Sequence, residues 1–174
     1  MPLQSSYNSD IGTINIAVSL SALFSGLFIV GAGDIADKIG RVKVTYIGLA
    51  LNIVGSILII ITPLPSLLII GRAIQGLSAA CIMPATLAII NEYYIGTARQ
   101  RALSYWSIGS WGGSGVCTLF GGLMATNLGW RSIFIVSIIL TILSMFLIKH
   151  TPETKAEPIG CLLYTSDAAD EGLG

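Results

Sequence analysis

Apolar stretches with almost no charge alternate with short charged or proline-containing segments along this 174-residue chain. Five stretches approach or exceed the roughly 20 residues that a helix needs to cross a bilayer. They run over residues 11–32, 44–62, 67–90, 102–126 and 132–148. The period-two alternation of a membrane barrel does not occur in them. The pattern therefore predicts an all-α integral membrane protein whose transmembrane domain is residues 1–155.

Prolines mark two points in this pattern. Pro63 and Pro65 separate the second and third spans, and Ser66 is placed to cap the third. Pro84 lies inside the third span, where we expect it to bend the helix.

The composition fits a membrane protein. Hydrophobic residues make up 53% of the chain and charged residues 10%, against about 25% charged residues in soluble domains. The mean hydropathy is +0.82. The formal net charge is zero, so we expect no nucleic-acid partner. His150 has no ligand-spaced neighbours, and Cys81, Cys117 and Cys161 are predicted to be packing residues, so we expect no metal site and no bound cofactor.

Basic residues indicate the orientation of the spans. Lys38, Arg41 and Lys43 lie between the first two spans, and Arg99 and Arg101 lie between the third and fourth. By the positive-inside rule these charged loops are cytoplasmic in a multi-pass protein of the cell membrane. The amino terminus would then lie outside with no preceding span. We therefore expect one more span upstream and a second half downstream, as the remainder of a longer chain.

The carboxyl-terminal residues 156–174 are predicted to be a tail. Within it, "CLLYTSDAADE" back-translates into a string that resembles a transposase sequencing adapter. We interpret residues 161–171 as non-native sequence. The alternative is an ordinary polar cytoplasmic tail.

The segment "GDIADKIGRVK", residues 33–43, concentrates charge and glycine between the first two spans. It fits the pattern G-x-x-x-D-x-x-G-R-x-K, which resembles the signature loop between helices 2 and 3 of the major facilitator superfamily. We expect a glycine at 33 to allow a close helix contact, a glycine at 40 to permit a tight reversal, and an arginine at 41 to hold a carboxylate at 37. The resemblance implies a conformational latch that holds the outward-facing state, and its predicted residues are Gly33, Asp34, Asp37, Gly40, Arg41 and Lys43. The alternative is that the basic residues serve topology alone.

The third span carries a charge near its start. Arg72, Gln75 and Gly76 share one helical face, and a charge inside a span costs roughly 2.5 kcal/mol or more, so it usually faces a cavity or partner. These residues resemble the R-x-x-Q-G element of the family's fourth helix, which implies a cavity position and a part in proton coupling. Alternatively, Arg72 extends to the membrane surface.

The fourth span carries small residues at i, i+4 spacing, namely Gly109, Gly113, Cys117, Gly121 and Ala125. Such a stripe predicts close helix packing. With Gly122 it resembles the antiporter element G-x-x-x-G-P-x-x-G-G of the family's fifth helix, although Cys117 and Thr118 replace its second glycine and its proline. Generic packing is the alternative.

Residues 4–155 as a whole resemble the fourteen-helix drug exporters of the superfamily. The resemblance implies a partial amino-terminal helix bundle, equivalent to helices 2–6, of a multidrug efflux antiporter that uses the proton gradient to export small amphipathic aromatic drugs. No carboxylate lies inside the five spans, so we expect the proton carrier to lie elsewhere and this chain alone not to transport. The alternatives are a sugar or organic-ion uniporter or symporter, and a non-transporting structural subunit. The spans also lack histidine, which argues against an enzyme.

Overall fold

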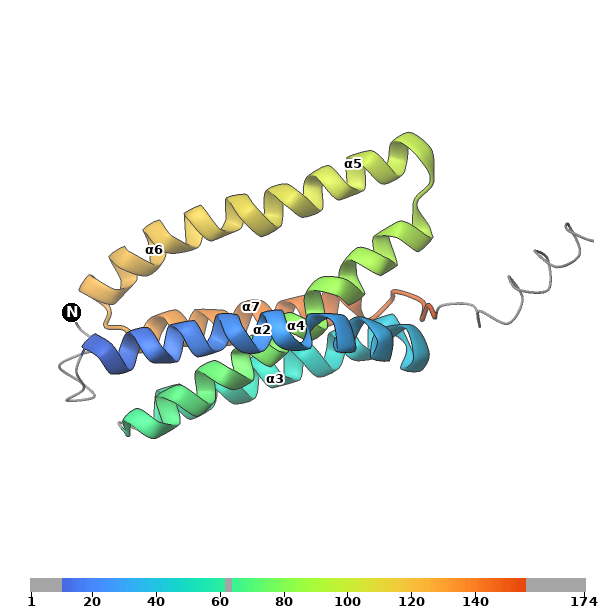
Figure 1. Cartoon of the computed structure of the whole chain (residues 1–174). Coiled ribbons are helices and arrows are strands. Elements are labelled where there is room, and N and C mark those ends of the chain that lie inside the picture. Colours follow the sequence, from blue (N-terminus) through green and yellow to red (C-terminus); the bar gives the residue numbers. More distant parts are fainter. Residues whose placement is uncertain (1–10, 62–63, 156–174) are drawn as a thin grey trace, which may run out of the picture.

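The computed structural model describes residues 11–61 and 64–155, which form helices and their connections (Figure 1). In chain order these are α2 (Ile11–Ile39), α3 (Arg41–Ile61), α4 (Pro65–Tyr93), α5 (Gly96–Ser107), the π-helical segment η1 (Ile108–Gly112), α6 (Gly113–Asn127) and α7 (Arg131–Ile148). The described residues are all-helical, as the sequence predicts. The predicted tail, with its suspected adapter segment, and Pro63 lie outside the described residues.

The first helix of the described residues extends beyond its predicted end. α2 continues to Ile39, although the predicted span ends at residue 32. Polar residues mark where a chain leaves an apolar layer, but a helix continues until a residue cannot adopt its geometry. That residue is Gly40, whose φ of +131° lies outside the helical region. The interpretation of residues 33–43 as a loop is therefore corrected: this segment is helical on both sides of Gly40.

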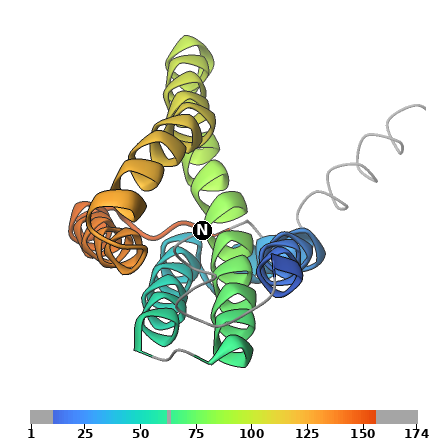
Figure 2. The same ribbon diagram turned by 90° about the vertical axis from the view of Figure 1, so that its left-hand side faces the viewer.

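The helix that contains the third predicted span, residues 67–90, begins at a proline. Pro65 is the first residue of α4, and Leu64, which precedes it, makes no side-chain cap. Proline suits a first helical position because its missing N–H needs no partner there. The prediction that Ser66 caps this helix is therefore wrong. Pro84 lies inside the second half of α4, and the carboxyl-terminal end of this helix diverges from α2 and α3 toward α5 (Figures 1 and 2).

Four helices in the described ranges are long and apolar enough to cross a membrane, within 15–39, Arg41–Ile61, Ser66–Tyr93 and Arg131–Ile148. The fourth predicted span, residues 102–126, lies in the helical path from Gly96 to Asn127. η1 divides this path into α5 and α6, each of which is shorter than a full crossing.

The long helices lie side by side in a row. Seen end-on, the order is α7, α3, α4 and α2, and the arm formed by α5, η1 and α6 rises away from the row and returns at the start of α7 (Figure 2). Many large apolar side chains point outward, among them Leu27, Val30 and Leu147, each about 70% exposed. In a membrane protein these surfaces are suited to contact with lipid.

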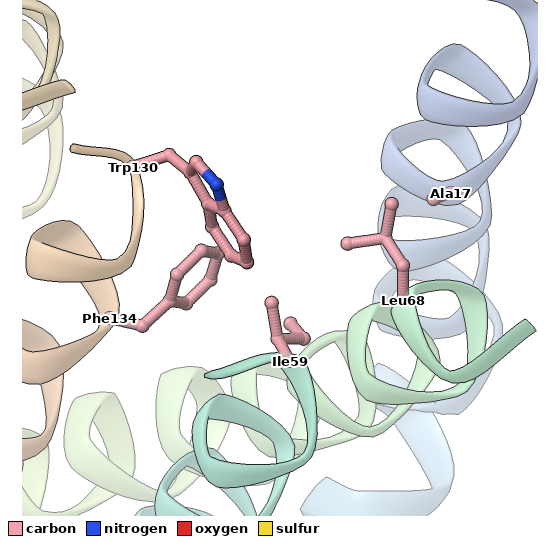
Figure 3. Packing of buried hydrophobic residues seen from close by; sticks show 5 residues of the cluster. All are labelled: Ala17, Ile59, Leu68, Trp130 and Phe134. Carbon is pink, nitrogen blue, oxygen red and sulfur yellow. The ribbon is translucent and has the colours of Figure 1, made fainter. Parts of the chain in front are cut away.

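A small apolar core joins the four long helices near the amino-terminal ends of α2, α4 and α7. Ala17, Ile59, Leu68, Trp130 and Phe134 are all buried and meet there (Figure 3). The Trp130 and Phe134 rings pack edge to face, with centroids 6.1 Å apart, a favourable arrangement for aromatic pairs. This core fixes the start of α7 against α3.

Glycines set the distance between α3 and α4. A Cβ added at Gly55 would lie 2.9 Å from the Gly71 carbonyl oxygen, and one added at Gly71 would lie 3.0 Å from the Gly55 carbonyl oxygen. Further along the same interface, the Ser78 hydroxyl donates a 2.7 Å hydrogen bond to the Gly48 carbonyl. Gly48 lies seven residues before Gly55 in α3, and its partner Ser78 lies seven residues after Gly71 in α4. The two helices are therefore antiparallel. Small residues let the two backbones touch, which is how helices associate in lipid.

Candidate functional site

The predicted pair of Asp37 and Arg41 is present at the junction of α2 and α3. Arg41 Nε lies 2.9 Å from Asp37 Oδ1, and Arg41 Nη1 lies 3.2 Å from Glu92 Oε2 near the end of α4. The arginine side chain is only 11% exposed, while the two carboxylates are 43% and 55% exposed. One buried guanidinium thus connects the ends of α2, α3 and α4, and we call this three-residue cluster the charged network.

Sequence reasoning missed Glu92. This residue lies 51 positions from Arg41, in an "NEYY" segment that lies outside the three family motifs described above. Its position at the end of an apolar span, on the side where the basic residues gather, was the available signal.

The remaining predicted latch residues have different surroundings. The side chains of Asp34 and Lys43 are exposed. A Cβ added at Gly33 would meet the Pro84 Cβ at 3.6 Å, which is an ordinary contact that an alanine could make. The expected need for glycine at position 33 is therefore not found in the described chain.

Gly40 allows the tight reversal as predicted. Its φ of +131° is unfavourable for any residue with a Cβ. A Cβ would also lie 2.6 to 3.0 Å from the carboxylate atoms of Glu153. Glycine at this position therefore serves both the backbone and the space that a neighbouring side chain occupies.

Arg72 and Gln75 line a polar cavity inside the row of helices. The cavity has a volume of about 330 Å³ and is lined by Ser21, Asn52, Arg72, Gln75, Trp130, Ile133, Phe134 and Ser137. The Arg72 guanidinium lies 5.3 Å from the centre of the Phe134 ring and donates a 3.4 Å hydrogen bond to Gln75 Oε1. Gln75 Nε2 in turn donates to Ser56 Oγ at 3.1 Å. Arg72 thus points between the helices, as expected of a residue that faces a cavity.

Gly76, the third residue predicted in this group, has a different role. A Cβ there would collide with the Ser21 carbonyl oxygen and would lie 3.0 Å from the Ser21 carbonyl carbon. Gly76 therefore sets the approach of α2 to α4 and does not line the cavity.

Asn52 is a cavity residue that sequence reasoning missed. Its Nδ2 donates to Thr141 Oγ1 at 2.7 Å and to Ser137 Oγ at 3.2 Å. These bonds join the middle of α3 to α7. An uncharged polar residue inside a predicted span was the signal, because such residues usually bond to a neighbouring helix.

The small-residue stripe of the fourth span has no close neighbour among the described residues. Cβ atoms added at Gly109, Gly113 and Gly122 would meet nothing within 4 Å, and one at Gly121 would meet only Ile133, at 4.0 Å. The predicted close packing on this stripe is therefore not found in the described ranges. One reason is that Gly109 lies in η1, and i, i+4 spacing keeps residues on one face only in an unbroken α-helix.

Two stripe residues, Cys117 and Gly121, border a second, mostly apolar cavity. Cys117 lies with Gly121 and Met124 of α6 against Ile133 and Leu140 of α7, around a space of about 360 Å³. Apolar clefts of this size can hold small molecules. This cavity differs in chemistry from the one beside Arg72, because polar or charged residues make up three of the eleven that line it and five of the eight that line the other.

Comparisons with known proteins agree on one family. The family model described as Major Facilitator Superfamily matches residues 1–160. The chain is 71% identical over 157 residues to the "Quinolone resistance protein NorB" of Staphylococcus aureus strains Newman, USA300 and COL. The matched part is 90% of this chain and 34% of each relative. The chain thus spans about a third of the length of these relatives.

Proposed function

Because this chain belongs to the Major Facilitator Superfamily, we propose that it is part of the amino-terminal half of a transporter that exports small amphipathic aromatic drugs, driven by the proton gradient. The observation that carries the proposal is the 71% identity, over 90% of this chain, to a protein named for quinolone resistance. The chain is a multi-pass membrane protein, and its relatives are transporters and not enzymes.

The charged network supports a conformational role for the α2–α3 junction. Arg41 holds two carboxylates with separate nitrogens of its planar guanidinium, and these carboxylates belong to different helices. The three helix ends therefore move together while these contacts last. In a transporter whose halves rock against each other, such a cluster stabilises one of the two states.

The polar cavity supports a role in coupling. Arg72 and Gln75 place a cation and an amide beside aromatic rings, on a helix that is long and apolar enough to cross a membrane, and a charge inside such a span is costly. The acidic side chains of the described residues, Asp34, Asp37, Glu92 and Glu153, lie at helix ends or beyond them. We propose that Arg72 and Gln75 respond to a proton carried by a group outside these residues.

A chimera tests the proposed function. The matching 157 residues of the Staphylococcus aureus NorB protein would be replaced by those of this chain, which the 71% identity favours structurally. Quinolone accumulation would be measured in cells that lack their own quinolone pumps, with NorB and an empty vector as controls. We expect the chimera to lower accumulation and a protonophore to abolish this effect.

Two results would contradict the proposal. Accumulation equal to that of the empty vector, with the chimera present in the membrane at the level of NorB, would show that this segment does not support export. Higher accumulation would favour the importer alternative. Within the chimera, Arg72→Ala should reduce export, whereas Arg99→Ala, at an exposed position on α5, should not.

The proposed orientation is tested by labelling. Lys38 near the end of α2 and Asn127 at the end of α6 are both exposed, and the proposed topology puts them on opposite sides of the membrane. Single cysteines at these positions, with the native cysteines replaced, would be treated with a membrane-impermeant maleimide in intact cells. We expect labelling at 127 and not at 38, and the reverse pattern would refute a cytoplasmic charged network.

A further inference from the structure

The chain returns to the α2–α3 junction after α7. Residues 151–155, which we call the return segment, lie against the start of α3, about 110 positions earlier in the sequence. The Tyr93 hydroxyl at the end of α4 donates a 2.9 Å hydrogen bond to the Pro152 carbonyl. The return segment thus contacts two of the three helix ends that the charged network connects.

The return segment supplies the amino-terminal cap of α3. The first N–H groups of a helix have no partner inside the helix, and Gly40, which precedes α3, has no side chain with which to cap it. Glu153 accepts hydrogen bonds from the Val42 N–H at 2.8 Å and from the Lys43 N–H at 3.1 Å. The Thr154 carbonyl accepts from the Arg41 N–H at 2.9 Å. Three of the first four N–H groups of α3 are therefore satisfied by residues beyond α7.

Two further features fit a carboxylate at this position. The absence of a Cβ at Gly40 leaves the space that the Glu153 carboxylate fills. A negative charge is also favourable at a helix amino terminus, where the peptide dipoles leave partial positive charge. Glycine at 40 and glutamate at 153 thus form a matched pair.

Arg41 connects this cap to the charged network. Its backbone N–H is held by the return segment, while its side chain is held by Asp37 and Glu92. Displacement of the return segment would release the backbone from which the guanidinium extends. We propose that Glu153 is a positioning residue of the charged network, which links the end of α7 to the latch. The role in transport rests on the proposed function, whereas the cap itself does not.

Amide hydrogen exchange of the 174-residue chain in lipid nanodiscs tests the cap. The variants are Glu153→Ala, Glu153→Gln and, as a control at a neighbouring exposed position, Lys155→Ala. We expect exchange at Val42 and Lys43 to rise at least tenfold in E153A, and less in E153Q because its amide oxygen can still accept one bond. K155A should match the unmodified chain. Exchange in E153A within twofold of the unmodified chain at both amides would overturn the proposal. If E153A does not fold, the exchange rates of E153Q at the same two amides are compared with those of the unmodified chain instead.

Transport in the chimera tests the link to the latch. We expect E153A to lower the maximal rate of quinolone export severalfold with KM unchanged, and E153Q to restore part of that rate. A chimera with E153A that exports at the full rate would overturn the positioning role even if the amides exchange faster. An unmodified chimera that does not export would refute the proposed function, while the exchange experiment would still decide whether Glu153 caps α3.

Discussion

Gly76 gives the most demanding test of how α2 and α4 pack. A Cβ at this position would collide with the backbone carbonyl of Ser21 and would lie 3.1 Å from the Ser21 Cα. The obstacle is main chain, so it cannot be relieved by a change of side-chain rotamer. Gly76→Ala therefore requires α2 to move away from α4.

Two opposing terms decide the size of the effect. Alanine stabilises a helix by about 1 kcal/mol relative to glycine. Overpacking costs about 1–3 kcal/mol, and the upper end applies when backbone must shift. The net expectation for G76A is a loss of about 2 kcal/mol in the free energy of unfolding, which is more than a tenfold change in the unfolding equilibrium.

Gly31→Ala is the matched control. Gly31 lies in α2, and a Cβ there would meet nothing within 4 Å, so only the helix preference changes. G31A should leave stability unchanged or raise it by up to about 1 kcal/mol. Both variants would be unfolded reversibly by titrating SDS into mixed micelles, with helix content followed by circular dichroism. We thus expect the two variants to differ by about 2–3 kcal/mol.

Equal stability of G76A and G31A would refute the reasoning. It would mean that α2 and α4 do not approach each other at Gly76 as closely as the structure has them. A loss confined to G76A, with helix content of the folded state retained, would support the close approach.

Three further substitutions test other contacts. Gly40→Ala should cost about 1–3 kcal/mol in the same titration because of its backbone angle, and a cost no larger than that of G31A would contradict the φ of +131°. Asn52→Leu should cost about 1 kcal/mol through its two lost hydrogen bonds to α7, and unchanged stability would show that these bonds contribute nothing. Arg41→Lys should lower quinolone export by the chimera severalfold, because one ammonium replaces a planar group that contacts two carboxylates, and full export at equal membrane level would count against the charged network.

The helices of this chain were predictable because their cause is local. A long run of apolar residues forms a helix in a bilayer, whose interior offers no other partner for backbone groups. The helix ends were less predictable, as α2 shows. Asp34 and Asp37 indicate where the chain leaves the apolar layer, whereas Gly40 decides where the helix stops.

The packing of the helices depends on information that sequence spacing does not contain. The regular stripe of the fourth span suggested close packing, yet no described residue packs closely on it. Gly48 and Gly55, seven residues apart on α3, and Gly71 on α4 bring these two helices together. Their pattern in the sequence is shorter than the five-residue stripe of the fourth span. Spacing identifies residues on one face of a helix, but it does not identify the helix that faces them.

The charged network shows the same limit at a site. The pair of Asp37 and Arg41 was predictable because its residues are four positions apart. Glu92 joins the network from 51 positions away, and Glu153 caps α3 beside it from 111 positions away. Only the folded arrangement of four helices brings these ends together.

The π-helical segment η1 changes how a mutational scan of the fourth span should be interpreted. Its i to i+5 bonding places an additional residue in the turn, which rotates later side chains by about 100° relative to a continuous α-helix. Sensitivity to substitution in α5 and in α6 should therefore be plotted on two separate helical wheels. Deleting one residue from η1 would bring the two wheels into a common phase.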